Sequence, residues 1–190
     1  DLPLPAPRPS NTTYLCVVDR DRTCVSFINS VYQSYGSGIT APRSGVVLQD
    51  RAAGFMLRDG HPNCIGPRKR PFHTIIPAMA LRDNRPAVLY GMVGGHFQPF
   101  GQSWLLSNLV DYGMNPQAAI DLPRGFAFGE GYRLERGIPE STEAALKAMG
   151  HSPLRWTPTL GAAHIIAIDW KTGTLTGGAD ARADGQALGY

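Results

Sequence analysis

Two apolar runs around a short polar turn are the feature that most constrains how this chain can fold. The runs are TIIPAMALRD at 74–83 and PAVLYGMVGG at 86–95, and the turn between them is RDNRP. Each run is too continuously apolar to leave one face in solvent, which is typical of strands covered on both sides. We therefore expect two central strands in a sheet that is buried on both faces.

The rest of the pattern predicts an α+β fold with helices segregated from mostly antiparallel strands. β-Rich segments predict further strands at 13–19, 23–30, 46–50, 162–170 and 174–180. Apolar spacing and end signals predict helices at 99–113, at 115–121 with Asn115 as cap, and at 139–150. Glycine, proline and serine at 35–45 indicate a shaped loop, and 51–73 has little regular pattern.

The composition is that of one globular domain with few surface charges. Of the 190 residues, 43% are hydrophobic and 17% are charged, so we expect another chain to cover part of the surface. The net charge is +3, and the only Lys/Arg run is RKR at 68–70. A nucleic-acid partner is therefore not expected, because such binding needs a concentrated basic face.

Nothing in the sequence predicts a membrane span, a metal or a cofactor. No apolar run approaches the roughly 18–20 residues that cross a bilayer, and the start, DLPLPAPRPS, predicts an extended proline-rich segment. The three cysteines have no CxxC spacing and the five histidines form no HExxH pattern. We expect a cytoplasmic location, or a periplasmic one if a preceding segment carries a signal.

The first candidate for chemistry is the glycine pair Gly94-Gly95, which lies between a buried strand and a helix. Two glycines there let the backbone approach a ligand and expose N–H groups, which can hold an oxyanion during acyl transfer. A plain strand-to-helix turn needs small residues too, so both readings stay open. No GxGxxG or P-loop pattern surrounds the pair, which disfavours a nucleotide site.

The second candidate is Thr12, which follows the proline-rich segment and directly precedes a strand. A threonine hydroxyl is a weak nucleophile, but a threonine at a new N-terminus can use its own α-amino group as the base. This amine has an ordinary pKa of about 7.7–8.0, so a useful fraction is neutral at physiological pH. Two other readings stay open: a structural strand-edge threonine, and a sugar acceptor at Asn11.

Six ordered segments resemble the small subunit of the γ-glutamyltransferase family of N-terminal-nucleophile (Ntn) hydrolases. They occur in the family's order, and the resemblance spans the chain from residue 11 to its end. They are NTTYLCVVDRDRTCVSFINS, YGSGITAPRSGVVLQD, GPRKRPFHTIIPAMALRD, YGMVGGHFQPFGQ, LVDYGMNPQAAIDLPRG and GGADARADGQALGY.

The resemblance implies an αββα four-layer sandwich made from two chains cut from one precursor. This chain would be the C-terminal half, with 1–11 as precursor tail and 12–190 as the catalytic small subunit. Its partner would be the large N-terminal subunit, in an αβ heterodimer or an α2β2 assembly. The cut would fall between Asn11 and Thr12.

The resemblance also assigns roles to individual residues. Thr12 matches the catalytic threonine, and Ser30 matches the hydroxyl residue that hydrogen-bonds it. Gly94 and Gly95 match the pair whose amides form the oxyanion hole. The implied reaction is ping-pong: the Thr12 hydroxyl attacks an amide, the amine leaves, and water or an acceptor amine resolves the acyl-enzyme.

The chain departs from the family's γ-glutamyl-specific pattern where the substrate would bind. The Asn, Gln, Asp and Ser-Ser set that holds the glutamate α-groups is replaced, and Gly54 stands where the carboxylate facing the ammonium should be. The predicted substrate-binding residues are Tyr32, Arg51, His73, Thr74 and His96.

The substitutions look more like the acylase and amidohydrolase branch of the family, which includes cephalosporin-acylase-like enzymes and oxamate amidohydrolase. We hypothesise that Arg51, with His73 or Thr74, binds an acyl group that carries a carboxylate but no ammonium, because Arg suits bidentate carboxylate recognition. A solvent-exposed Arg51 is the alternative.

The predicted function is therefore an N-terminal threonine amidohydrolase or acyltransferase acting on a small amide such as oxamate or a glutaryl or γ-glutamyl amide. The alternatives are a true γ-glutamyltransferase or glutathione hydrolase, and a catalytically dead homologue that acts in binding or assembly. The presence of Thr12, Ser30 and the glycine pair argues against the dead homologue.

Overall fold

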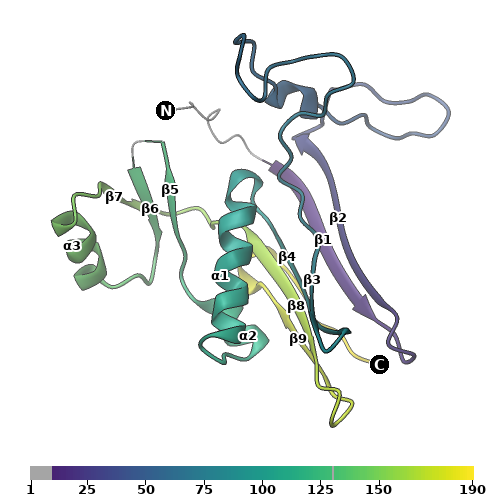
Figure 1. Cartoon of the computed structure of the whole chain (residues 1–190), viewed down its shortest axis with the longest axis vertical. Helices are drawn as coiled ribbons and strands as arrows, with labels where there is room; N and C mark the ends of the chain where they lie inside the picture. Colours follow the sequence, from purple (N-terminus) through teal and green to yellow (C-terminus); the bar gives the residue numbers. More distant parts are fainter. Residues whose placement is uncertain (1–9, 130) are drawn as a thin grey trace.

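A four-stranded antiparallel sheet forms the centre of the α+β fold in the computed structural model, which describes residues 10–129 and 131–190 (Figure 1). Its strands, in spatial order, are β3 (Ala78–Arg82), β4 (Arg85–Val93), β8 (Ala162–Ile168) and β9 (Leu175–Ala179). The strands predicted at 74–83, 86–95, 162–170 and 174–180 thus form one sheet, in which β4 and β8 pair at the centre.

The two faces of this sheet carry different layers. Helices α1 (Gln98–Val110) and α2 (Pro116–Asp121) cover one face, and the hairpin of β1 (Ser10–Val18) and β2 (Cys24–Gln33) packs on the other (Figure 1). Successive side chains of a strand point to opposite faces. Accordingly, Met92 of β4 contacts α1 at Gly101, whereas Gly91 contacts the ring of Tyr14 in β1.

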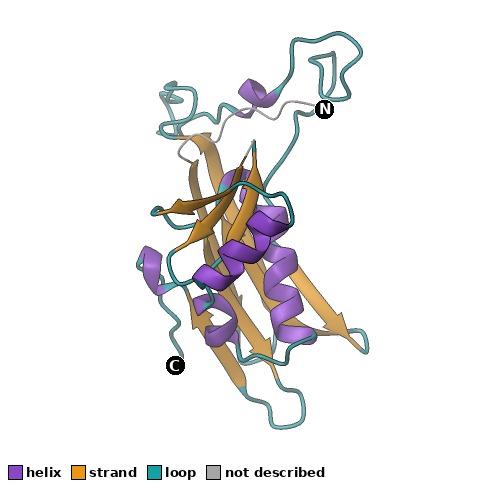
Figure 2. Ribbon diagram, turned by 90° about the vertical axis from the view of Figure 1, so that its left-hand side faces the viewer, coloured by secondary structure: helices purple, strands orange, loops and turns teal. Residues whose placement is uncertain are grey.

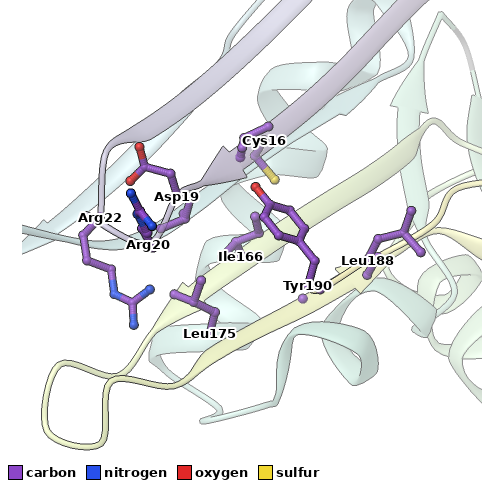
Figure 3. Close-up of a pocket in the computed structure, with 13 residues that line it drawn as sticks. Cys16, Asp19, Arg20, Arg22, Ile166, Leu175, Leu188 and Tyr190 are labelled. Atoms are coloured by element: carbon purple, nitrogen blue, oxygen red, sulfur yellow. The ribbon is translucent and has the colours of Figure 1, made fainter.

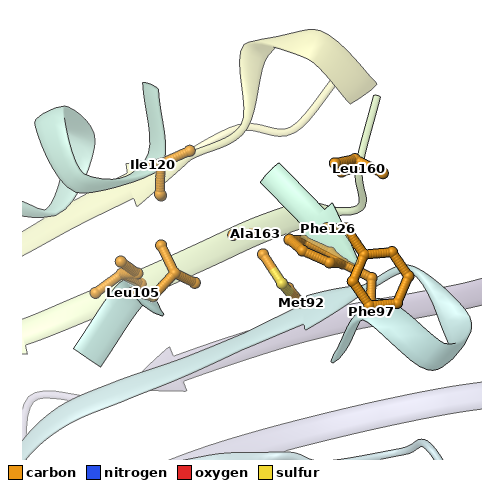
Figure 4. Close-up of a cluster of buried hydrophobic side chains, with 8 residues drawn as sticks. Met92, Phe97, Leu105, Ile120, Phe126, Leu160 and Ala163 are labelled. Carbon is orange, nitrogen blue, oxygen red and sulfur yellow. The ribbon is translucent and has the colours of Figure 1, made fainter. Parts of the chain in front are cut away.

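The main hydrophobic core lies between the sheet and the helices (Figure 4). Met92 and Ala163 come from the sheet, and Leu105 and Ile120 come from α1 and α2. Each of these four side chains is fully buried. Removal of this apolar area from water is the principal force that holds the helices on the sheet.

The expectation that both apolar runs form central strands is confirmed for β4 and is wrong for β3. Leu89 and Met92 of β4 are fully buried, whereas Met79 and Leu81 of β3 are exposed. Strand β3 is the edge strand of the sheet, with β4 as its only neighbour among the described strands. Continuous apolar character is therefore compatible with an edge position.

The predicted helices are confirmed, including the cap. The Asn115 side chain accepts a hydrogen bond from the Ala118 N–H at 2.8 Å, and Pro116 takes the first helical position. Helix α3 (Glu140–Ala148) lies apart from the main core and has no buried residue.

A second, three-stranded sheet was not predicted. It contains β5 (Gly125–Phe128), β6 (Gly131–Glu135) and β7 (Pro153–Trp156), and it stands with α3 beside the main sandwich (Figures 1 and 2). The available sequence signal was the alternation of aromatic residues at Phe126, Phe128 and Tyr132, on either side of a glycine-containing turn.

The segment between β2 and β3 is irregular. The prediction of a strand at 46–50 is wrong. The segment makes only an isolated bridge, between Thr40 and Val47, and Val46–Leu48 are exposed. It folds back on its own loop, where the Ser37 N–H donates to the Leu48 carbonyl. Without a neighbouring sheet, β propensity alone does not make a strand. A short 3₁₀ helix, η1 (Arg51–Gly54), follows.

The outer face of the β1–β2 hairpin is apolar and uncovered. Leu15 pairs with Phe27, and Val17 pairs with Val25, and all four side chains are 43–50% exposed. A contiguous apolar patch of this kind usually marks an interaction surface. Across residues 10–129 and 131–190, the structure contains no helix with the length and apolar character needed to span a bilayer.

Candidate active site

The predicted nucleophile lies at the start of β1, beside its predicted partner. The Thr12 Oγ1 atom is 2.9 Å from the Ser30 Oγ atom, a hydrogen-bond distance between two partly buried hydroxyls. The pairing shifts register here: Asn11 pairs with Tyr32, but Thr12 pairs with Ser30, which leaves Val31 as an extra residue. The Asn11–Thr12 peptide bond thus faces a β-bulge, a device that re-aims a side chain next to active sites.

Tyr14 anchors this strand on the central sheet. Its ring is 3% exposed and lies over Gly91, where an added Cβ would stand 2.5 Å from the ring. Its hydroxyl is 2.9 Å from the Ser26 Oγ atom. Burial raises the pKa of Tyr14 far above its ordinary value, so the hydroxyl stays protonated. Thr12 and Tyr14 are two residues apart on one strand, so the anchored ring holds the part of β1 that carries Thr12 against the sheet.

Gly91→Ala is therefore expected to push the Tyr14 ring off the sheet. Overpacking of this kind costs about 1–3 kcal/mol in the free energy of unfolding. Urea unfolding measures this loss. The control is Gly66→Ala, whose new Cβ would have its nearest contact at 3.8 Å. Equal stability of the two variants would contradict the anchoring role.

The glycine pair forms a tight turn between β4 and α1, at the end of the sandwich where β1 begins (Figure 1). Gly94 has φ 136° and Gly95 has φ 57°, both in the region that disfavours other residues. Because β1 packs against β4, the end of β4 lies near the start of β1. The turn leads into η2 (Gly95–Phe97), so its N–H groups open a helical segment.

Arg51 is buried, which answers the question left open by the sequence. It is 4% exposed, its Nη1 donates to the Thr74 Oγ1 at 3.3 Å, and its guanidinium lies 5.0 Å from the centroid of the Tyr32 ring. Burial lowers the pKa of Arg51, but an arginine stays charged. Its Nη2 is buried without a hydrogen-bond partner among the described residues. A buried cation with a free donor is suited to an anionic ligand.

Gly54 lies on the same face of η1 as Arg51, because residues three apart eclipse in a 3₁₀ helix. A Cβ at this position would meet the Tyr32 hydroxyl at 3.8 Å and the Phe72 carbonyl at 3.9 Å, ordinary contact distances. A side chain would therefore fit, and its absence leaves no carboxylate at position 54; the neighbouring Asp50 is the carboxylate that acts electrostatically on Arg51.

Two histidines of the predicted substrate set lie in different settings. His96 follows the glycine pair, is partly buried, and lies between the rings of Phe72 and Phe128 at centroid distances of 5.7 and 5.8 Å. Burial lowers the pKa of His96, which keeps it neutral at pH 7. His73 is exposed, and its Nδ1 lies 2.8 Å from the Pro71 carbonyl oxygen.

One buried residue that sequence reasoning missed connects the two halves of the site. The Gln98 side chain is fully buried, and its amide, oriented to donate, reaches the carbonyl oxygens of Met92 and Thr74 at 3.2 and 2.5 Å. It ties the strand that leads to the glycine pair to the segment that holds Arg51. A polar residue at a buried helix start was the only sequence signal.

A hollow of about 550 Å³ lies elsewhere, at the far end of β1 (Figure 3). Its lining includes Cys16, Arg20, Ile166, Leu175 and Tyr190. None of the predicted site residues lines it. Burial raises the pKa of the Cys16 thiol to about 11, so this thiol stays protonated at neutral pH.

Comparison with known proteins decides the family. The gamma-glutamyltranspeptidase family model matches residues 3–190. The chain belongs to this family. The predicted family resemblance and the predicted α+β fold of Ntn hydrolases are thereby confirmed.

Within the gamma-glutamyltranspeptidase family, the chain is similar to proteins with different names. The glutathione hydrolase-like YwrD proenzyme of Bacillus subtilis (strain 168) is 42% identical over 189 residues, covering 95% of this chain and 36% of the relative. The oxamate amidohydrolase proenzyme of Klebsiella pneumoniae subsp. pneumoniae is 34% identical over 191 residues. This match covers 96% of this chain and 36% of the relative.

Among solved structures of the family, the crystal structure of cephalosporin acylase from Bacillus halodurans superposes with a TM-score of 0.86 and 37% identity. The match covers 93% of this chain and 34% of that protein. The chain thus spans about a third of the length of these relatives.

Proposed function

We propose that this chain is the catalytic small subunit of an Ntn amide hydrolase or acyltransferase that cuts its own precursor between Asn11 and Thr12. The observation that carries the proposal is the 2.9 Å contact between the Thr12 and Ser30 hydroxyls at the β-bulge. It puts a hydrogen-bonded hydroxyl next to the peptide bond that would be cut. The names of the relatives, which are proenzymes, support the same reading.

The proposed cut begins when the Thr12 Oγ atom attacks the Asn11 carbonyl carbon. The bond from that carbon to the Thr12 nitrogen breaks, and the acyl group moves from nitrogen to oxygen, giving an ester. Water then hydrolyses the ester, which leaves a carboxylate on Asn11 and a free α-amino group on Thr12. Only after this step can Thr12 use its own amine as the base.

In turnover, the α-amine takes the proton of the Thr12 hydroxyl as its oxygen attacks the substrate amide. The oxyanion that forms would be held by the N–H groups of Gly94 and Gly95. The amine product leaves with the proton, and an ester to Thr12 remains. Water, or an acceptor amine in the transfer reaction, then attacks the ester and regenerates the hydroxyl.

We further propose that the acyl group carries a carboxylate and no ammonium. The support is the buried Arg51, whose Nη2 has no hydrogen-bond partner among the described residues, and the absence of a side chain at Gly54. An oxamate or glutaryl amide would pair with Arg51, with the Thr74 hydroxyl beside it. A γ-glutamyl substrate would find no carboxylate at position 54 for its ammonium, which costs binding energy.

The proposed partner is a large N-terminal subunit from the same precursor. The chain spans about a third of its relatives, so the remaining length of such proteins is available as a partner. The exposed apolar face of the β1–β2 hairpin, including Leu15 and Phe27, supports a covering layer on that side. This layer would complete the fourth level of the sandwich.

The test is a substrate panel on the full-length protein after processing. Oxamate, glutaryl amides and γ-glutamyl amides are compared by kcat/KM, with release of the amine as the readout. We expect turnover of at least one carboxylate-bearing amide and weak activity on γ-glutamyl amides. A preference for γ-glutamyl amides would favour the glutathione hydrolase alternative, and no turnover at all would favour a dead homologue.

Gly54→Asp is expected to invert this preference. The new carboxylate would stand next to Arg51 and repel the substrate's carboxylate, so kcat/KM for oxamate or glutaryl amides should fall by about tenfold or more. The kcat/KM for γ-glutamyl amides should rise, because the ammonium of these substrates gains a carboxylate partner. Gly54→Asn is the matched control, with nearly the same shape and no charge. If Asp and Asn variants behave alike, charge at this position does not select the substrate.

A further inference from the structure

Outside the site described above, four charged side chains form a network beneath the turn of the glycine pair. Arg124 and Asp180 are each 1% exposed and pair at 2.7 Å from Nη2 to Oδ2. Arg182 joins Asp180 at 2.8 Å and Glu135 at 2.9 Å. Burial alone would raise the pKa of the Asp180 carboxyl, but bonds from Arg182 and Arg124 outweigh burial and hold the pKa below its ordinary value.

Arg124 also binds the end of α2 and the loop before β8: its Nη2 donates to the Ile120 carbonyl oxygen at 3.0 Å. Its Nη1 donates to the Leu160 and Gly161 carbonyl oxygens, both at 2.9 Å. Glu135 accepts hydrogen bonds from the N–H groups of both Arg124 and Leu160. The loop at 160–161 is therefore held through its N–H side and its carbonyl side at once.

This loop packs directly against the glycine pair. A Cβ on Gly94 would come within 3.0 Å of the Gly161 Cα, and a Cβ on Gly161 would come within 2.2 Å of the Val93 carbonyl oxygen. The two turns thus touch backbone to backbone, with no side chain between them. A shift of Gly161 must therefore be transmitted to Gly94.

Stability alone does not explain why a charged network is buried here. Arg124 keeps a charge in the core, and its Nε is buried with no hydrogen-bond partner among the described residues. A buried ion pair is often no more stabilising than apolar residues of the same volume. The planar fork of an arginine, however, fixes three carbonyls and a carboxylate in one geometry, which a lysine or an apolar residue does not reproduce.

We propose, building on the acyl-transfer function above, that Arg124 is a positioning residue that holds Gly161 against Gly94 and so fixes the oxyanion-binding amides. Arg124 acts through the loop and touches no substrate. Asp180 in turn orients the guanidinium. Oxyanion donors must be placed to within a fraction of an ångström, and a misplacement of about 1 Å costs roughly a hundredfold in rate.

The test uses the full-length processed protein with Arg124→Lys, which keeps the charge and loses the fork. We expect kcat per active site, counted by titration of acyl-enzyme, to fall about 10- to 100-fold. KM should stay within about threefold, because the substrate pocket at Arg51 is unchanged. Amide hydrogen exchange in peptides covering 92–98 should become faster, a readout that does not depend on activity.

The matched control is Leu105→Ala, which opens a cavity in the same core away from Gly161. We expect it to lower the urea midpoint at least as much as Arg124→Lys while kcat and exchange at 92–98 stay unchanged. If Arg124→Lys does not fold or process, Asp180→Asn, which frees the guanidinium without removing it, should give the same kcat loss and faster exchange. Unchanged exchange at 92–98 in these variants overturns the positioning role.

The two proposals fail in different ways. Wild-type protein that turns over no amide, and behaves like Thr12→Ala, contradicts the proposed function, while the exchange measurement still tests the link from Arg124 to Gly94. Active wild-type protein together with unchanged kcat in Arg124→Lys contradicts only the positioning role.

Discussion

Thr12→Ala in the full-length precursor is expected to abolish both the cut at Asn11–Thr12 and amide turnover. The variant lacks the oxygen that attacks in both steps, so no ester forms on either path. Intact-mass measurement should show a single uncut chain. Turnover of the best amide should fall at least about a thousandfold, the scale seen when a nucleophile is removed.

Thr12→Ser is the control, because it keeps a hydroxyl at the same position and removes only a methyl group. We expect it to process and to turn over substrate, with a lower rate. If Thr12→Ala still splits at the same bond and still turns over substrate, Thr12 is not the nucleophile. The sugar-acceptor reading of Asn11 is tested in the same mass spectra, because a glycan would add a large, discrete mass.

Arg51→Ala is expected to have the next largest effect, and the effect should depend on the substrate. Loss of a buried charged partner costs about 2–5 kcal/mol of binding, roughly 30-fold to several thousandfold in kcat/KM. This loss should appear for carboxylate-bearing amides, mostly as a higher KM. An amide of similar size without the carboxylate should show little change, because it never pairs with Arg51.

The control for this prediction is Arg58→Ala, in the same segment between β2 and β3. Arg58 is exposed, so its removal should leave both substrates unaffected. Urea unfolding of both variants separates lost binding from lost folding. Near-normal kinetics of Arg51→Ala on the carboxylate-bearing amide would show that Arg51 is only a buried structural cation.

Elements that form from local signals were predictable from sequence. The cap at Asn115, the β1–β2 hairpin and the central strand β4 depend on capping, alternation or continuous apolar character within a few residues. The strand expected at 46–50 failed because a strand needs a neighbour, and Val47 finds only an isolated bridge. The edge position of β3 was hidden for a related reason: sequence does not say how many neighbours a strand has.

The residues of the candidate site could be named from the sequence, but their geometry could not. Resemblance to the family pointed to Thr12 and Ser30, and the structure brings their hydroxyls to 2.9 Å. Arg51 could be named, but its burial could not, because the sequence around it looks like an exposed loop. Gln98 and Arg124 were missed, since their partners lie far away in the chain and only folding brings them together.

The sequence by itself determined the family, the α+β class, and a glycine pair that ends a buried strand. These features depend on residue identity and short-range order. The tertiary structure decided that Arg51 is a buried cation whose Nη2 finds no partner in the part of the chain that the structure describes, and that Arg124 reaches Gly161 across 37 residues of chain. The reason is physical: burial and hydrogen-bond partners belong to the packed layers, which form only when distant strands and loops meet.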